Sequence, residues 1–134
     1  MMAVTDGADW ILRSMVAMAS SDGRLDSREI SLIQQVYHDQ SGRSLTGDEV
    51  ARAGSETAKG GNILAQLAEA APSLDRDTKE EIIRASYLVL LADDRIAGEE
   101  RKRLQDIAAA LQVPEIHFGA ILEDLAIWLA QQKQ

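Results

Sequence analysis

The sequence predicts an all-α protein, a single compact bundle of about seven helices with an internal pseudo-twofold repeat. Three observations support this prediction. Apolar residues recur at helical intervals along nearly the whole chain, and no alternating run rich in β-branched residues indicates a strand. Capping and turn residues separate the periodic segments. Residues 14–29 also match residues 85–100, at an offset of 71 positions.

This internal repeat aligns SMVAMASSDGRLDSRE with ASYLVLLADDRIAGEE. Each copy runs from an apolar segment through an acidic turn into a charged, helix-forming segment. Asp22 aligns with Asp93 and Glu29 aligns with Glu100, and the apolar positions agree through the following helix. We interpret the pattern as a duplicated unit of helix, acidic turn and helix.

The two copies cover roughly residues 9–40 and 77–112. Because each unit leaves an apolar face uncovered, we expect the two units to pack together, related by an approximate twofold axis. The chain of 134 residues has the length of one domain, so we expect a single domain over residues 1–134.

Composition excludes several classes of function. A net charge of −8 and a pI near 4.7 argue against a nucleic-acid binder, since that function needs clustered Lys and Arg. The absence of cysteine excludes thiolate metal sites and cysteine nucleophiles. No apolar stretch is long enough to span a bilayer, so we expect a cytoplasmic protein without direct membrane insertion. The serines lack a histidine and an acid in a recognisable order, and we expect no enzyme.

The first half of the chain predicts four helices. The first, over residues 9–20, is apolar on more than one side and should be buried on most sides. The second starts at Asp26, where Asp26 and Glu29 have capping-box spacing, and ends near His38. A second capping box at Thr46 opens the third helix. The fourth helix is short and stops at Pro72.

The second half predicts three more helices. The fifth restarts near Asp75, runs into the second acidic turn and is expected to be the most buried element. Val89 and Leu90 on this helix, with Leu104 on the sixth, should lie in the core. The sixth helix begins near residue 97 or 98 and ends at Val113–Pro114. The alternating charges over residues 99–103 predict a solvated face of the sixth helix.

The final helix carries a candidate surface for a protein partner. Trp128, with Leu125 and Leu129, forms an apolar stripe on this helix. Such a stripe can dock a partner or close the core of the bundle.

The acidic turns resemble part of a calcium loop. Residues 22–29 match the second half of an EF-hand loop, ending at its bidentate glutamate. The first half is missing, because Met18 and Ser20 stand where the first and third ligands would be. An ordinary EF-hand is therefore excluded.

Two interpretations of the repeated acids stay open. In one, Asp22 and Asp93 shape the turns while Glu29 and Glu100 accept hydrogen bonds from amides at the helix starts. In the other, the two corners meet and gather four carboxylates, which would need a cation to stay ionised. The ligands would all be oxygens, so Ca²⁺ or Mg²⁺ would be favoured over Zn²⁺.

The chain resembles the TerB-like proteins, which act in tellurite resistance and stress response and share their fold with the N-terminal region of a membrane-bound DnaJ-type co-chaperone. ASSDGRLDSRE, LLADDRIAGEE and the helix that leads into Val113–Pro114 carry the resemblance. It implies an all-helical domain with acidic residues at two repeated corners, associated with metal stress and membrane-bound assemblies. On the matching positions, the implied acidic site comprises Asp22, Glu29, Asp93 and Glu100.

We therefore expect a non-enzymatic stress-response domain that binds a divalent cation, Ca²⁺ or Mg²⁺, at these four acids and acts as an interaction module. The alternative is a protein–protein adaptor without a metal, in which the acids are structural helix caps. In both cases we expect a protein partner, and a membrane-associated complex is among the partners we expect.

Overall fold

The computed structural model describes residues 7–20, 24–92 and 98–132. These residues form seven α-helices and one short 3₁₀ helix, and no strand occurs among them, which confirms the all-α prediction. In chain order the elements are α1 (Gly7–Ala19), α2 (Ser27–Ser41), α3 (Gly47–Lys59), α4 (Ile63–Ala70), η1 (Ala71–Ser73), α5 (Arg76–Ala92), α6 (Gly98–Ala110) and α7 (Glu115–Gln132).

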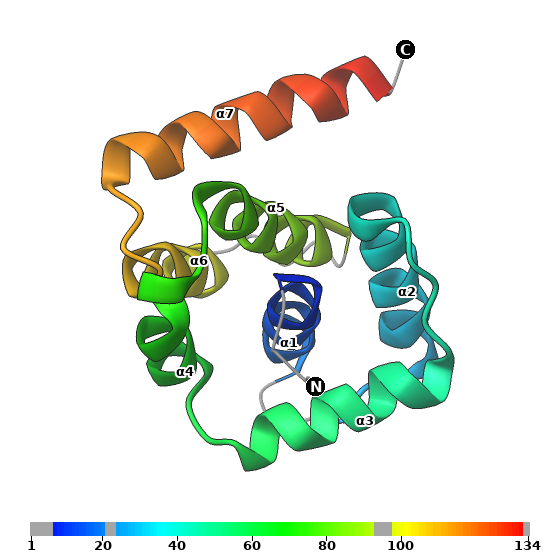
Figure 1. Cartoon of the computed structure of the whole chain (residues 1–134). Coiled ribbons are helices and arrows are strands. Elements are labelled where there is room, and N and C mark those ends of the chain that lie inside the picture. Colours follow the sequence, from blue (N-terminus) through cyan, green and yellow to red (C-terminus); the bar gives the residue numbers. More distant parts are fainter. Residues whose placement is uncertain (1–6, 21–23, 93–97, 133–134) are drawn as a thin grey trace.

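α1 lies at the centre of the bundle, where α2, α3, α4 and α5 pack around it (Figure 1). The expectation of a helix buried on most sides is confirmed. Its buried apolar residues are Trp10, Ile11, Leu12, Met15, Val16, Met18 and Ala19. The expectation that the fifth helix is the most buried element is wrong, because residues 76–81 of α5 are exposed or half-buried, whereas residues 9–19 of α1 are all buried or half-buried.

α5 and α6 complete the core beside α1. Val89, Leu90 and Leu104 are each at most 1% exposed, which confirms their predicted burial. Ser86 is also fully buried, and its hydroxyl donates to the carbonyl oxygen of Ile82 at 2.8 Å. This bond satisfies a polar group that would otherwise destabilise the apolar interior.

Local hydrogen bonds determine where α3 and α5 begin. Thr46 Oγ1 accepts from the Glu49 amide at 3.1 Å, and Glu49 Oε1 accepts from the Thr46 amide at 2.9 Å, so the predicted capping box is confirmed. Asp75 Oδ1 accepts from the Thr78 amide at 2.8 Å at the start of α5. The bond from the Thr46 amide lowers the pKa of Glu49, and hydrogen bonds from the side chain and the amide of Thr78 lower the pKa of Asp75, because they stabilise the ionised carboxylates.

A residue beyond the end of α2, and another beyond the end of α6, adopt a left-handed backbone conformation. α2 continues to Ser41 rather than ending near His38, because the Gly42 amide (φ 76°) donates to the His38 carbonyl at 2.8 Å and closes the last turn. At the end of α6, Gln112 adopts φ 63° and the Val113 amide donates to the Ala108 carbonyl at 2.9 Å. α6 thus ends at Ala110, three residues before the predicted end at Val113–Pro114.

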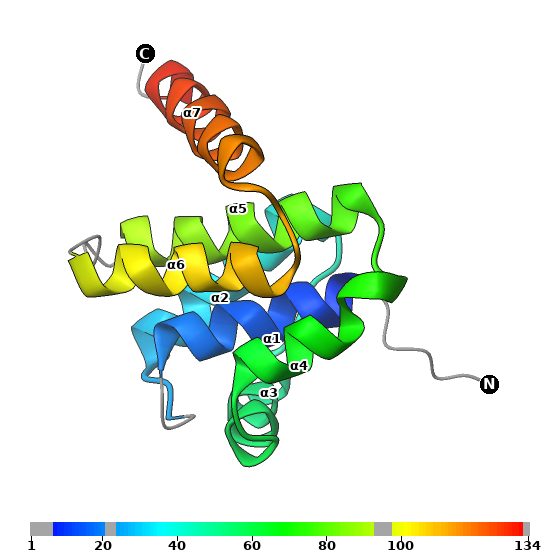
Figure 2. The ribbon, with the colours of Figure 1, turned by 90° about the vertical axis from the view of Figure 1, so that its left-hand side faces the viewer.

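α7 crosses α5 and α6 on the outside of the bundle, and its C-terminal end extends away from them (Figures 1 and 2). The side chains that attach it to the bundle recur at i, i+3 and i+7. They are Phe118, Ile121 and Leu125, all of which are buried. The outer side of α7 has no described element packed on it (Figures 1 and 2).

Candidate functional site

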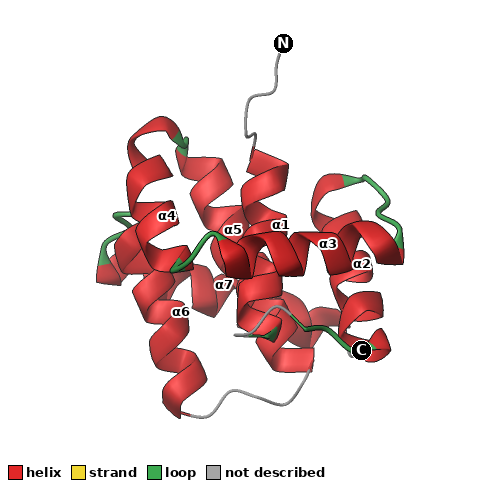
Figure 3. Ribbon diagram, turned by 90° about the horizontal axis from the view of Figure 1, so that it is seen from below, coloured by secondary structure: helices red, strands yellow, loops and turns green. Residues whose placement is uncertain are grey.

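The helix ends that flank the two predicted acidic corners lie at the same end of the bundle. α1 and α5 pack side by side and run in the same direction, and α2 and α6 both begin at the end where α1 and α5 finish (Figures 2 and 3). The chain therefore leaves the first helix of each repeat and enters the second helix at one end of the molecule. The approximate twofold relation between the two helix pairs stays a prediction.

Glu29 is the one predicted ligand whose side chain the structure describes. Its Oε1 atom accepts a hydrogen bond from the Asp26 amide at 3.0 Å, and Asp26 Oδ1 accepts from the Glu29 amide at 2.8 Å. The two residues form the predicted capping box at the start of α2. One carboxylate oxygen of Glu29 thus contributes to the helix start, as the structural interpretation of the acids expected.

The other three predicted ligands cannot be placed against Glu29. Asp22 and Asp93 lie outside the described residues, and Glu100 belongs to the first turn of α6 with a side chain outside the described set. Within the described residues, no group of three or more His, Asp or Glu side chains is arranged to hold a metal ion. Convergence of the four acids therefore stays a prediction.

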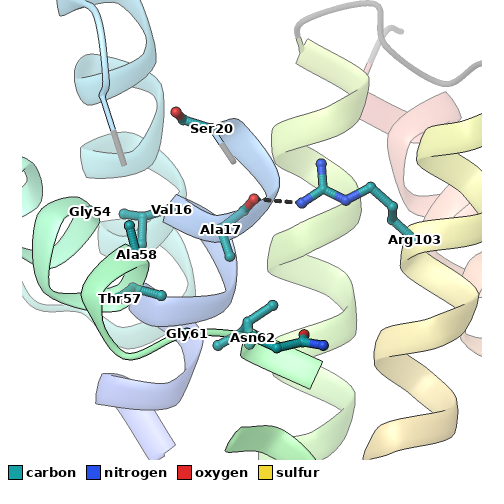
Figure 4. A pocket seen from close by; sticks show the side chains of 10 residues that line it. Val16, Ala17, Ser20, Gly54, Thr57, Ala58, Gly61, Asn62 and Arg103 are labelled. Carbon is teal, nitrogen blue, oxygen red and sulfur yellow. Dashed lines mark hydrogen bonds between the residues drawn. The ribbon is translucent and has the colours of Figure 1, made fainter. Parts of the chain in front are cut away.

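Arg103 on α6 hydrogen-bonds to the C-terminal end of α1. Its Nη2 atom donates a hydrogen bond to the carbonyl oxygen of Ala17 at 2.8 Å (Figure 4). Ala17 lies in the last turn of α1, where carbonyl oxygens lack intrahelical donors and the helix dipole favours a cation. The predicted solvated face over residues 99–103 is wrong for Arg103, because its side chain is half-buried beside α1.

Sequence reasoning missed this contact, which joins residues 86 positions apart. The repeat contained a signal, because Arg103 aligns with Leu32, so a basic residue stands where the first copy has an apolar one. Such an exchange indicates that the second copy has acquired a polar partner or a solvent-exposed position. Only the packing of α6 beside the end of α1 distinguishes the two.

A pocket of about 180 Å³ lies beside this bond, between α1, α3 and the start of α4 (Figure 4). Small residues such as Gly54 and Ala58 line it together with Asn62 and Arg103. Asn62 Oδ1 accepts from the Leu64 amide at 2.8 Å and so caps α4, while Arg103 is engaged with α1. Both polar groups serve the fold, and we assign the pocket no chemistry.

The predicted partner stripe on α7 is only partly accessible. Leu125 is 5% exposed and belongs to the interior, Leu129 is half-buried, and Trp128 is 45% exposed. Sequence reasoning missed two other exposed residues of α7, Ile116 and Ile127. Partner binding by the predicted stripe stays a prediction.

Two half-buried acids of α5 have different roles. Glu80 Oε1 lies 2.9 Å from His117 Nε2, and this contact joins α5 to α7. Burial raises the pKa of the Glu81 carboxyl, and the negative charges of Asp77 and Asp75 raise it further.

The fold and these contacts define a small helical domain whose polar side chains mainly cap and join helices. The sequence profile of the family described as "Tellurite resistance protein TerB" matches residues 11–123, and the chain belongs to this family. Comparison with curated proteins and with solved structures gave no significant match. Among the described residues, none of the helices combines the length and apolar character needed to span a membrane.

Proposed function

We propose that this TerB-family chain is a non-enzymatic stress-response domain that binds a divalent cation, Ca²⁺ or Mg²⁺. The ligands in the proposal are the carboxylates of Asp22, Glu29, Asp93 and Glu100. The bound cation would control the binding of a protein partner. The proposal extends to a partner that is part of a membrane-associated complex.

The placement of the flanking helix ends carries this proposal. α1 and α5 finish at the end of the bundle where α2 and α6 begin, so Glu29 and Glu100 belong to first turns at that end, and Asp22 and Asp93 precede these two helices in the sequence (Figure 3). Carboxylates that share a site repel one another and favour a bound cation. An all-oxygen ligand set suits Ca²⁺ and Mg²⁺.

The functional consequence is a change of charge with little change of shape. The chain carries a net charge of −8, and a divalent cation would neutralise part of the negative charge at one end of the bundle. A partner that recognises this end would then bind or leave according to its affinity for the two charge states. Helices α1 and α5 need not move, because their contacts lie in the apolar core.

Calorimetric titration and thermal melting of metal-free protein with Ca²⁺, Mg²⁺ and Zn²⁺ test the proposal. For a dissociation constant of about 1 mM, about 10 mM Ca²⁺ should stabilise the fold by about 1.4 kcal/mol. The double variant Asp22→Asn, Asp93→Asn should lose this effect. Asp48→Asn, Asp124→Asn is the matched control, because it removes the same charge from exposed positions on α3 and α7. Absence of heat and of stabilisation in wild type would refute the proposal.

The adaptor without a metal is the second candidate, and the capping box of Glu29 favours it. In this function the acids serve as caps, and Trp128 with the half-buried Leu129 forms the partner surface, because Leu125 is buried in the bundle. Glu29→Gln separates the two candidates, because glutamine preserves a capping box but removes the charge. Weaker cation binding by Glu29→Gln than by wild type supports the metal site. Equal stability of the two proteins, with no effect of cation on either of them, supports the adaptor.

A further inference from the structure

α7 carries a second stripe on the side that faces away from the bundle. Its positions follow one another at intervals of four, three, four and three residues, and all are exposed: Ile116, Ala120, Glu123, Ile127 and Ala130. The exposed fraction is 89% for Ile116 and 52% for Ile127. Figures 1 and 2 show no other described element on this side of the helix.

The spacing indicates that a helix is the natural occupant of this stripe. Alternating intervals of four and three residues are those of a heptad repeat, in which side chains of one helix insert between those of another. Ile116 and Ile127 lie about 16 Å apart along the helix axis, about three turns. The alanines at 120 and 130 are small enough to allow a partner helix to approach closely. The bundle does not need the stripe, because Phe118, Ile121 and Leu125 attach α7 from its other side.

Charge determines which helix fits. Glu123 occupies the middle of the stripe and borders a pocket that Arg101 of α6 also lines. α7 itself carries Glu115 and Asp124 but no Lys or Arg between Glu115 and Gln132. A second copy of the chain is disfavoured, because parallel pairing, or antiparallel pairing with full overlap, sets Glu123 against Glu123. Each copy also brings a net charge of −8. A partner helix with a basic residue opposite Glu123 avoids the repulsion between two Glu123 side chains and the addition of a second net charge of −8.

We infer that the outer stripe of α7 docks an amphipathic helix of a partner protein that presents Lys or Arg to Glu123. The inference rests on the interaction-module part of the proposed function and is independent of the cation. The family match ends at residue 123, so Ile127 and the exposed Trp128 lie beyond it. Of the stripe, Ile116, Ala120 and Glu123 lie within the matched residues, and Ile127 and Ala130 lie beyond them.

Two synthetic amphipathic peptides of the length of α7 test the inference. Both carry Ile and Ala at the heptad positions, and they differ only in a central Lys or Glu. Anisotropy titrations with the full chain should show about 10-fold tighter binding of the Lys peptide. Glu123→Lys should reverse the preference. Glu69→Lys is the matched control, because it makes the same charge change at an exposed position on α4, away from the stripe, and should preserve the preference for the Lys peptide.

A second pair of variants tests the apolar part of the stripe. Ile116→Gln, Ile127→Gln should weaken binding of the Lys peptide by about 10-fold, since both anchors are lost. Ala68→Gln adds the same side chain at an exposed position on α4, away from the stripe, and should bind as wild type. Circular dichroism should show unchanged helix content in all variants, because each replaced side chain is exposed.

Three results would overturn the inference. The first is an equal change of peptide preference in Glu123→Lys and Glu69→Lys. The second is no loss of binding on replacing both isoleucines. The third is sedimentation that shows a dimer of the chain which the isoleucine variant dissociates. Ca²⁺ titrations of the same proteins keep the two proposals apart. Peptide binding without cation binding would refute the metal site alone, whereas cation binding without peptide discrimination would refute the docking face alone.

Discussion

Replacing Arg103 with methionine should destabilise the protein by removing the hydrogen bond from α6 to the last turn of α1. Methionine preserves most of the apolar stem but cannot donate to the Ala17 carbonyl, which Arg103 Nη2 reaches at 2.8 Å. Hydrogen bonds with a charged partner contribute about 1.5 to 3 kcal/mol. Because Arg103 and Ala17 are only half-buried, water can replace part of the bond, and we expect a loss of about 1 to 2 kcal/mol.

This loss corresponds to a measurable change in melting temperature. An unfolding entropy of about 2.1 cal/mol/K per residue amounts to about 0.28 kcal/mol/K for the 134 residues. We therefore expect Arg103→Met to lower the melting temperature by about 4 to 7 °C, measured by calorimetry or circular dichroism. Arg101→Met is the control, because Arg101 is exposed on the same helix and its loss should cost less than about 0.5 kcal/mol. Equal melting temperatures for the two variants would mean that the hydrogen bond between Arg103 and Ala17 contributes nothing to the stability of the fold.

Two further predictions concern α5. Leu90→Ala should cost about 2 to 5 kcal/mol in denaturant melts, because Leu90 is 1% exposed and its truncation leaves a cavity; a loss within a few tenths of wild type would contradict its place in the core. Glu81→Gln should raise the melting temperature near pH 7. The folded-state pKa of Glu81 lies above its ordinary value of 4.5, so its favourable contribution exists below about pH 4.5 and is lost as pH rises through the folded pKa. The difference from wild type should therefore vanish near pH 4, and a more stable wild type near pH 7 would show that attraction to Arg84 outweighs burial.

The capping boxes were predictable because they depend on residues three positions apart. Asp26 with Glu29 and Thr46 with Glu49 pair through their own backbone amides, whatever the rest of the chain does. The burial of Leu90 was predictable for a similar reason, since a helix with a broad apolar face must cover it. The end of α2 was placed too early, because the Gly42 cap extends the helix through Ser41.

For the proposed metal site, the sequence supplied candidate ligands but not their geometry. The repeat at an offset of 71 residues identified the same acids twice, and the absence of cysteine limited their ligand chemistry to oxygen and imidazole. The common end of the bundle at which α1 and α5 finish depends on how the two units pack (Figure 2). No local rule determines that packing, because both directions of α5 would bury its apolar residues.

The sequence by itself therefore determined the all-α class, the helix starts and the identity of the repeated acids, because each follows from short-range hydrogen bonding or from helical periodicity. Only the tertiary structure decided that α1 rather than α5 lies at the centre, that Arg103 reaches Ala17, and which side of α7 remains exposed. α7 has apolar residues on two sides, so periodicity alone cannot tell which side packs. The contacts with α5 and α6 bury Phe118 and Leu125, and they leave Ile116 and Ile127 in solvent.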